Sequence, residues 1–244
     1  VCSSDLTDSK AIDSGAQARD PNALQTVSAD KSAAQGAGGG IVGAIEKAID
    51  GHREFLAPDR SSLRTEIVFV DTTVKDFQTL VEGIGPNTRV VLLDPNVDAL
   101  KQISNVLQQY QPGQVDALHL ISHGGEGQLD LGATPLNQTT MRTTYAEELK
   151  QIGERLNENA DILVYGCDFG KGEDGQEAAQ LLSQLTGADV AASVDKTGDA
   201  ALGGNWNLEY KTGSIETGII IDGMAQEHFH DVLALQTLDF DTAV

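Results

Sequence analysis

Apolar runs alternate with helix-like patterns along the central part of the chain. The apolar runs are six to eight residues long, are rich in β-branched residues and are bounded by turn residues, a pattern typical of buried strands. They cover residues 66–71, 88–94, 115–122, 161–166 and 188–193. Between them, apolar residues recur every three or four positions, which predicts amphipathic helices.

Helix start signals stand between these runs. Thr73, Asn96, Thr144 and Asp174 are each predicted to cap the helix that follows. Strands that alternate with helices in this way are joined by right-handed crossovers and form a mainly parallel sheet. The sequence therefore predicts an α/β fold, a three-layer sandwich that has a mainly parallel sheet with helices on both faces.

Two segments depart from the alternation. Residues 123–132, HGGEGQLDLG, place Leu129 and Leu131 alternately with polar residues between glycines, which predicts a short edge strand or a hairpin. Residues 203–221 predict a C-terminal β-hairpin, with Trp206 as its large apolar anchor.

The domain organisation follows from composition. Residues 1–40 are polar and small, so burial could not repay the entropy of ordering them, and we expect a disordered leader. Residues 41–65 predict a short helix and a linker, residues 66–231 the α/β domain, and residues 232–244 a linker or the start of a following domain. Because the chain begins with Val1, we expect it to be a fragment.

The charge of the chain excludes one class of partner. Acidic residues outnumber basic ones 37 to 16, and the net charge is −21. Binding to nucleic acid requires clustered Lys and Arg, so we expect no nucleic-acid partner. The acidity suits an extracellular or calcium-rich setting, and it equally suits a well-solvated surface. No apolar run is long enough for a membrane span in this fragment.

Two residues that could carry chemistry follow two of the predicted strands. His123 comes directly after the strand at 115–122, and Cys167 directly after the strand at 161–166. Parallel strands present their carboxyl ends at one edge of a sheet, so the two side chains are expected in one cleft. An imidazole beside a thiol can activate it for acyl transfer, and the N–H groups of Gly124 and Cys167 could form an oxyanion hole.

Other interpretations of these residues stay open. A lone cysteine that ends a buried strand is commonly a small core residue. One usable thiol and one nearby histidine are too few for zinc, so we expect no metal site and no required cofactor, although calcium stays open. Asp168 could line a substrate pocket that prefers Lys or Arg, or it could solvate a loop. His119 lies deeper on its strand, and we expect it to be structural.

Two sequence blocks carry a resemblance to known families. HLISHGGEGQLDLG at 119–132 and ILVYGCDFGKGEDGQ at 162–176 resemble the caspase, legumain, gingipain and separase clan of cysteine peptidases. More closely, the region from Glu66 to Asp231 resembles the bacterial domain of unknown function 4347. That resemblance implies a caspase-like fold, catalytic roles for His123 and Cys167, and a place near the N-terminus of a large secreted or cell-surface, adhesin-like protein.

Two functional hypotheses follow. The first is a caspase-like cysteine endopeptidase whose substrate is a polypeptide, either its own chain or a neighbouring surface protein. The second is a non-catalytic N-terminal module for surface retention or adhesion, which keeps the fold without turnover. The reactivity of the Cys167 thiol separates them, because a catalytic cysteine reacts with alkylating reagents near neutral pH and a buried structural thiol does not.

Overall fold

The computed structural model describes residues 64–235. The leader expected at residues 1–40 lies outside the described residues, as do nearly all of the short helix and linker expected at 41–65 and the end of the segment expected at 232–244.

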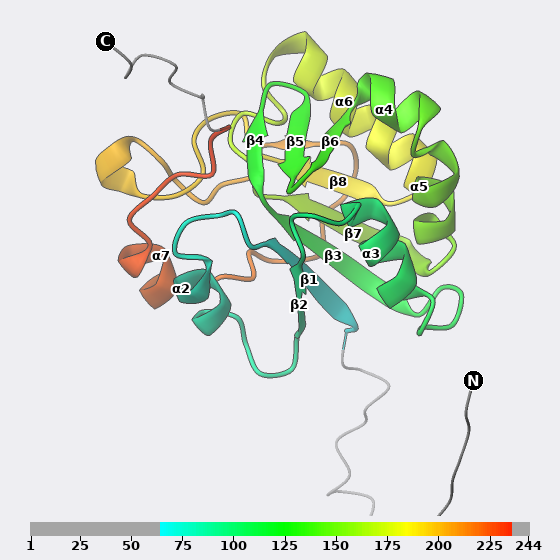
Figure 1. Cartoon of the computed structure of the whole chain (residues 1–244), viewed down its shortest axis with the longest axis horizontal. Helices are drawn as coiled ribbons and strands as arrows, with labels where there is room; N and C mark the ends of the chain where they lie inside the picture. Colours follow the sequence, from blue (N-terminus) through cyan, green and yellow to red (C-terminus); the bar gives the residue numbers. More distant parts are fainter. Residues whose placement is uncertain (1–63, 236–244) are drawn as a thin grey trace, which may run out of the picture. The chain divides into compact units, whose positions relative to one another are not determined.

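A six-stranded sheet forms the centre of the domain (Figure 1). Its strand order is β2-β1-β3-β7-β8-β9, and all neighbouring pairs are parallel except β8 and β9. The strands are β1 (Glu66–Asp71), β2 (Arg89–Leu93), β3 (Val115–Ile121), β7 (Leu156–Val164), β8 (Asp189–Ala192) and β9 (Tyr210–Lys211). The predicted α/β fold with a mainly parallel sheet is confirmed.

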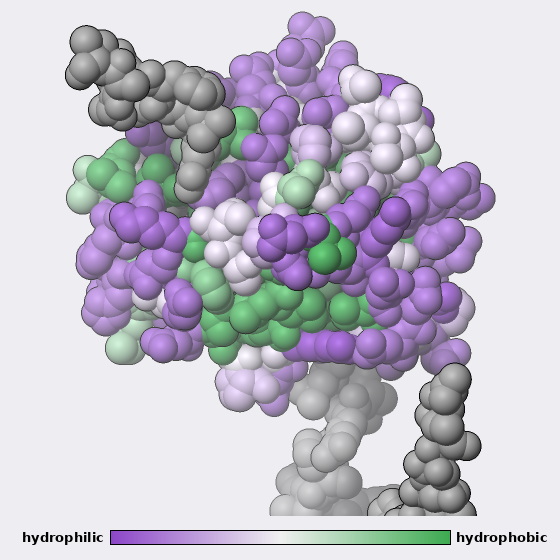
Figure 2. All heavy atoms as spheres, in the orientation of Figure 1, coloured by the Kyte–Doolittle hydropathy of each residue, from purple (hydrophilic) through white to green (hydrophobic). Residues whose placement is uncertain are grey.

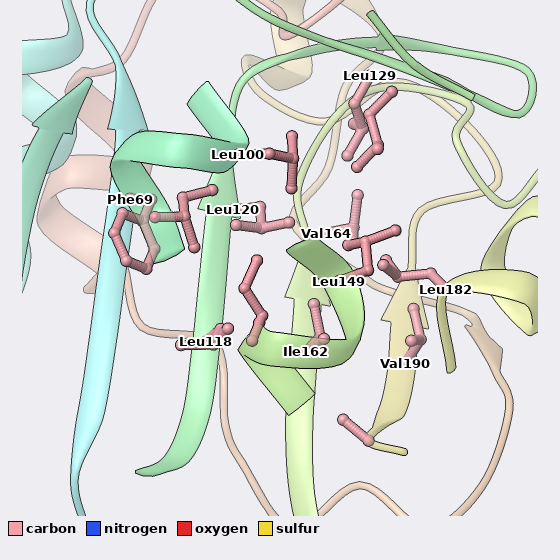
Figure 3. Close-up of a cluster of buried hydrophobic side chains, with 14 of the residues drawn as sticks. Phe69, Leu100, Leu118, Leu120, Leu129, Leu149, Ile162, Val164, Leu182 and Val190 are labelled. Atoms are coloured by element: carbon pink, nitrogen blue, oxygen red, sulfur yellow. The ribbon is translucent and has the colours of Figure 1, made fainter. Parts of the chain in front are cut away.

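Helices lie against both faces of this sheet. The first face, which includes Ile67 and Phe69, packs against α3 (Ala99–Leu107), α5 (Ala146–Gly153) and α6 (Gly172–Thr186). Figure 3 shows the leucine-rich core that these helices cover. The second face, which includes Val68 and Val70, packs against α2 (Phe77–Glu82) and α7 (Gly223–His228). The alternation along β1 shows why both faces are apolar, since successive side chains point to opposite sides.

The edge strand β2 is only partly covered. Leu92 on this strand is 50% exposed, and Figure 2 shows hydrophobic surface where Figure 1 places β2. Among residues 64–235, no helix is long and apolar enough to cross a membrane.

A separate three-stranded antiparallel sheet stands at the carboxyl end of β3. Its strands are β4 (His123–Gly125), β5 (Gln128–Leu131) and β6 (Thr134–Asn137). The predicted hairpin at 123–132 is thus present and gains a third strand. Gly127 and Gly132 occupy the turns with φ of 67° and 59°, a left-handed conformation that glycine adopts without steric cost.

Several helix boundaries differ from those predicted. Helix α3 is capped by Asp98, whose side chain accepts from the Lys101 N–H, because the Asn96 N–H instead donates to Asp94 in a turn. The short helix α4 (Gln138–Thr143) was not predicted, although Asn137 and Thr140 form its capping box. Helix α2 begins at Phe77, α5 at Ala146 and α6 at Gly172, so the caps predicted at Thr73, Thr144 and Asp174 are wrong.

The predicted C-terminal hairpin is not formed. Strand β9 pairs with β8 instead, and the second half of the expected hairpin binds a carboxylate. The N–H groups of Glu216 and Thr217 both donate to Oδ2 of the buried Asp161. Because this carboxylate takes the donors that a partner strand would need, no hairpin follows β9. Trp206 does pack against aromatic neighbours, with its ring centroid 5.8 Å from that of Phe229.

Candidate active site

His123 and Cys167 come from the ends of adjacent parallel strands. Strands β3 and β7 pair with Leu120 opposite Val164. The Tyr165 N–H donates to the Leu120 carbonyl and extends this pairing. His123 is the first residue of β4, which begins just after β3. Cys167 lies in the loop that follows β7. Both residues therefore lie at the carboxyl edge of the central sheet, where the sequence placed them.

The His123 ring has one partnered nitrogen. Nε2 lies 3.4 Å from the carbonyl oxygen of Thr73. A carbonyl oxygen can only accept, so this contact places the proton on Nε2 and leaves a lone pair on Nδ1. Nδ1 is buried and has no hydrogen-bond partner within residues 64–235. His123 thus holds an unoccupied basic nitrogen inside the site.

The Cys167 thiol is completely buried. Its Sγ accepts a 3.2 Å hydrogen bond from the Thr197 N–H and lies 3.6 Å from the Thr197 carbonyl oxygen. Burial raises the pKa of the thiol to about 11, against a smaller lowering by the Thr197 N–H. Cys167 is therefore a protonated thiol at neutral pH, and activation would require a base.

The structure does not bring the two side chains into hydrogen-bonding contact. In the described part of the chain, neither His123 nitrogen has Cys167 Sγ as a partner, and each side chain binds backbone atoms instead. What the structure does bring together are the two backbone N–H groups expected to form an oxyanion hole. The Gly124 N–H and the Cys167 N–H donate to the same carbonyl oxygen, that of Leu233, at 2.8 and 3.0 Å.

The segment Asp231–Leu235, here called the strap, supplies that carbonyl. On one side of it, the Leu233 N–H donates to the Thr197 carbonyl and the Asp199 N–H donates to the Asp231 carbonyl, both at 2.9 Å. On the other side, the Leu235 N–H donates to the Gly124 carbonyl at 3.0 Å. Residues 232–235, which the sequence analysis assigned to a linker or a following domain, therefore lie in the candidate site.

Sequence reasoning missed the strap and its partners. Thr197 and Gly198 meet the strap, and Thr73 meets His123, through backbone atoms, and backbone contacts leave no signature in residue type. A signal for the strap itself was present, because Val232, Leu233, Ala234 and Leu235 form an apolar run of the kind that extended segments bury.

Asp168 is engaged away from the oxyanion donors. Its carboxylate lies 2.9 Å from the Lys171 Nζ, and its N–H donates to the Asp195 carbonyl. The hydrogen bond to Asp168 raises the pKa of Lys171 above its ordinary value. Asp168 also has a φ of 57°, an uncommon conformation for a residue other than glycine. This conformation turns the chain sharply just after Cys167.

His119 belongs to a separate buried network. The Tyr165 hydroxyl accepts from the Ile220 N–H and lies 3.1 Å from Nδ1 of His119. On the other side of the ring, Nε2 lies 3.4 Å from Oε2 of Glu66. The contact with His119 lowers the pKa of the Glu66 carboxyl below its ordinary value. His119 thus ties β1 to the segment after β7 without contacting the strap.

Within residues 64–235, no group of three or more His, Cys, Asp or Glu side chains is arranged to hold a metal ion. A search of curated proteins found no match. The family described as a domain of unknown function, DUF4347, matches residues 67–233. The match begins in β1, includes His123, Gly124 and Cys167, and ends at Leu233. This chain therefore belongs to the DUF4347 family.

Proposed function

We propose that the domain is a caspase-like cysteine endopeptidase with Cys167 as nucleophile and His123 as general base. One observation carries the proposal: the N–H groups of Gly124 and Cys167 converge on a single peptide carbonyl oxygen. Two backbone donors on one carbonyl are the arrangement that stabilises the oxyanion of a tetrahedral intermediate. The site requires no cofactor for this chemistry.

The geometry of each group supports a role in acyl transfer. The thiol proton has to be removed before attack, because burial keeps Cys167 protonated. The unpartnered Nδ1 of His123 is the basic nitrogen that can take this proton, and the Thr73 carbonyl holds the ring in the required tautomer. Since the two side chains are not in hydrogen-bonding contact, proton transfer requires one of them to move toward the other.

We further propose that this peptidase is a module of a large secreted or cell-surface, adhesin-like bacterial protein. The acidic composition, with a net charge of −21, supports a solvated extracellular setting. The substrate is a polypeptide, and calcium is to be tested as an activator because surface proteins of this kind commonly carry calcium-binding repeats.

An irreversible peptidyl acyloxymethyl ketone tests the proposal. The thiolate of an activated cysteine displaces the carboxylate of such a compound and is alkylated, which is efficient only when a base and an oxyanion hole activate the site. We expect an adduct on Cys167 of the wild-type chain and none on the His123→Ala variant. Iodoacetamide in denaturant is the control, since it should label Cys167 equally in both chains. Equal labelling of both folded chains by the ketone would contradict the proposal.

The second candidate function is a non-catalytic module for surface retention or adhesion. The observation that favours it is the burial of Cys167, whose thiol has no exposed surface and a raised pKa, as a structural cysteine has. Under this alternative, the ketone leaves Cys167 unmodified in the wild-type chain. The same experiment therefore separates the two candidates.

A further inference from the structure

The strap lies in the candidate site with the geometry of a bound peptide substrate. Before Leu233 it runs antiparallel to the segment after β8, with Val232 opposite Gly198. After Leu233 it runs parallel to β4, with Ala234 opposite Gly124. The Leu233 carbonyl stands at the junction of these two pairings and receives both oxyanion donors. Main-chain pairing on both sides of one carbonyl is how an extended peptide is bound and positioned.

We infer that the strap is a substrate of this same site and that the bond cleaved is Leu233–Ala234. This inference rests on the proposed endopeptidase function and adds the identity of its substrate. Among residues 64–235, the Leu233 carbonyl is the one that accepts from both Gly124 and Cys167. The Ala234 N–H makes no hydrogen bond to any described residue, so the leaving nitrogen is free to receive a proton.

The Leu233 side chain defines the specificity of the cleavage. It is completely buried and packs in the second core face together with Cys167, Tyr165 and Phe229. An apolar pocket of this kind accepts an aliphatic residue and rejects a charged one, because burying an unpaired charge is costly. The site therefore prefers an aliphatic residue before the cleaved bond, and not the Lys or Arg that an acidic pocket would select.

Two glycines leave room for the strap. A Cβ at Gly125 would lie 2.6 Å from the Leu235 Cδ1, with strap atoms as its only neighbours within 4 Å in the described structure. A Cβ at Gly198 would lie 2.3 Å from the Asp231 carbonyl oxygen and 2.9 Å from the Val232 Cα. Gly125 thus leaves room for the Leu235 side chain, and Gly198 leaves room for the backbone of Asp231 and Val232.

The cleavage follows the steps of ordinary acyl transfer through a thioester. The Cys167 thiol gives its proton to His123, and Sγ forms a bond to the Leu233 carbonyl carbon. The bond from that carbon to the Ala234 nitrogen breaks, and the nitrogen takes the proton from His123. Water then hydrolyses the thioester, with His123 as base, and releases a Leu233 carboxylate and the free thiol. Peptide and water are the reactants, and no oxidant or reductant takes part.

The test follows the intact mass of the 244-residue chain over time, with and without calcium. We expect the wild-type chain to give a new C-terminus at Leu233 and the Cys167→Ala variant to stay intact. The rate should not change on dilution, because the bond is cleaved within its own molecule. Ala234→Pro should abolish cleavage at this bond, since the tertiary amide of proline fits poorly in the site. The substitution removes no hydrogen bond to a described residue, because the Ala234 N–H donates to none of them.

Leu233→Asp provides an independent measurement, since it should slow cleavage at least about 100-fold by placing a charge in the apolar pocket. Leu92→Asp is the matched control, because Leu92 is 50% exposed and lies on the edge strand β2, and it should leave the rate unchanged.

The outcomes distinguish this inference from the proposed function. Cys167-dependent cleavage at another bond would overturn the inference and support the endopeptidase. Cleavage that persists in Ala234→Pro, or that is not slowed in Leu233→Asp, would also overturn the inference. A wild-type chain that stays intact with and without calcium would overturn it as well. In that case, a ketone adduct on Cys167 would still support the endopeptidase function. The absence of an adduct would contradict both the endopeptidase function and the inferred cleavage of the strap.

Discussion

Gly124 and Gly166 lie in backbone contact: a Cβ on Gly124 would be 2.7 Å from both the Cα and the carbonyl carbon of Gly166. This close approach brings the chain after His123 against the chain before Cys167. Gly124→Ala would force the two strand ends apart and separate the oxyanion donors. We expect cleavage to fall about 100-fold or more, with a loss of about 1–3 kcal/mol in the free energy of unfolding.

Gly85→Ala is the control for this substitution. A Cβ at Gly85 would meet no heavy atom within 4 Å. The control should leave both the cleavage rate and the urea midpoint nearly unchanged. Gly124→Ala cleaving at the wild-type rate would show that the approach of the two glycines does not position the donors.

A comparison of the two buried histidines separates catalysis from stability. His123→Ala should lower the cleavage rate by about 10²–10⁴-fold, because proton transfer is lost. Its free energy of unfolding should fall by no more than about 2 kcal/mol, since Nδ1 has no partner to lose and the contact of Nε2 with the Thr73 carbonyl is long, at 3.4 Å.

His119→Ala should show the reverse pattern. It removes a fully buried ring and leaves the Tyr165 hydroxyl without its His119 contact, so we expect a loss of about 2–4 kcal/mol in stability. Cleavage by the folded fraction should stay within a few-fold of the wild type. Urea unfolding and intact mass measured on both variants check the two expectations, and a stability loss in His123→Ala equal to that in His119→Ala would contradict them.

The pH dependence of the Cys167 thiol follows from its burial. Its pKa is raised from 9.0 to about 11, so the folded state keeps a proton that the unfolded state has released. The thiol therefore contributes stability that is fully present below about pH 9 and is lost as pH rises toward about 11.

The ultraviolet absorbance of the thiolate measures this pKa directly. The absorbance of the His123→Ala variant is compared with that of the His123→Ala, Cys167→Ala double variant. The contribution of Cys2 is the same in both chains and cancels in the difference, and neither chain cleaves itself. We expect the difference to titrate near pH 11. A midpoint below the ordinary value would indicate a thiolate already stabilised in the resting site.

The Asp161 carboxylate organises the segment after β9. It accepts hydrogen bonds from the N–H groups of Glu216 and Thr217 and from the Thr217 hydroxyl. Asp161→Ala would leave these donors without an acceptor and should cost about 2–4 kcal/mol. Asp161→Asn keeps one acceptor oxygen and should cost clearly less. Urea unfolding of both variants tests the difference, and equal losses would show that packing and not hydrogen bonding holds this segment.

The sequence was sufficient to predict the central sheet, because β1, β3 and β7 are buried on both faces and their apolar runs have no competing interpretation. It also placed His123 and Cys167 at one edge, since that follows from parallel strand order alone. The failures have a different cause. The predicted hairpin after Trp206 was lost to a carboxylate on β7, and the strap is held by carbonyl and N–H groups of residues such as Thr197. Such long-range backbone contacts depend on the folded geometry and not on local residue type.

The two halves of the strap are held unequally. The part that ends at Leu233 keeps its hydrogen bonds to Thr197 and Asp199, whereas the part beyond it is joined by the Leu235 N–H to Gly124. After a cut between Leu233 and Ala234, the part beyond Leu233 would keep the Leu235 N–H bond to Gly124 but lose its covalent link, so the site would open from that side. The new Leu233 carboxylate would then compete with other peptides for the two oxyanion donors, and self-cleavage would precede any action of the domain on another chain.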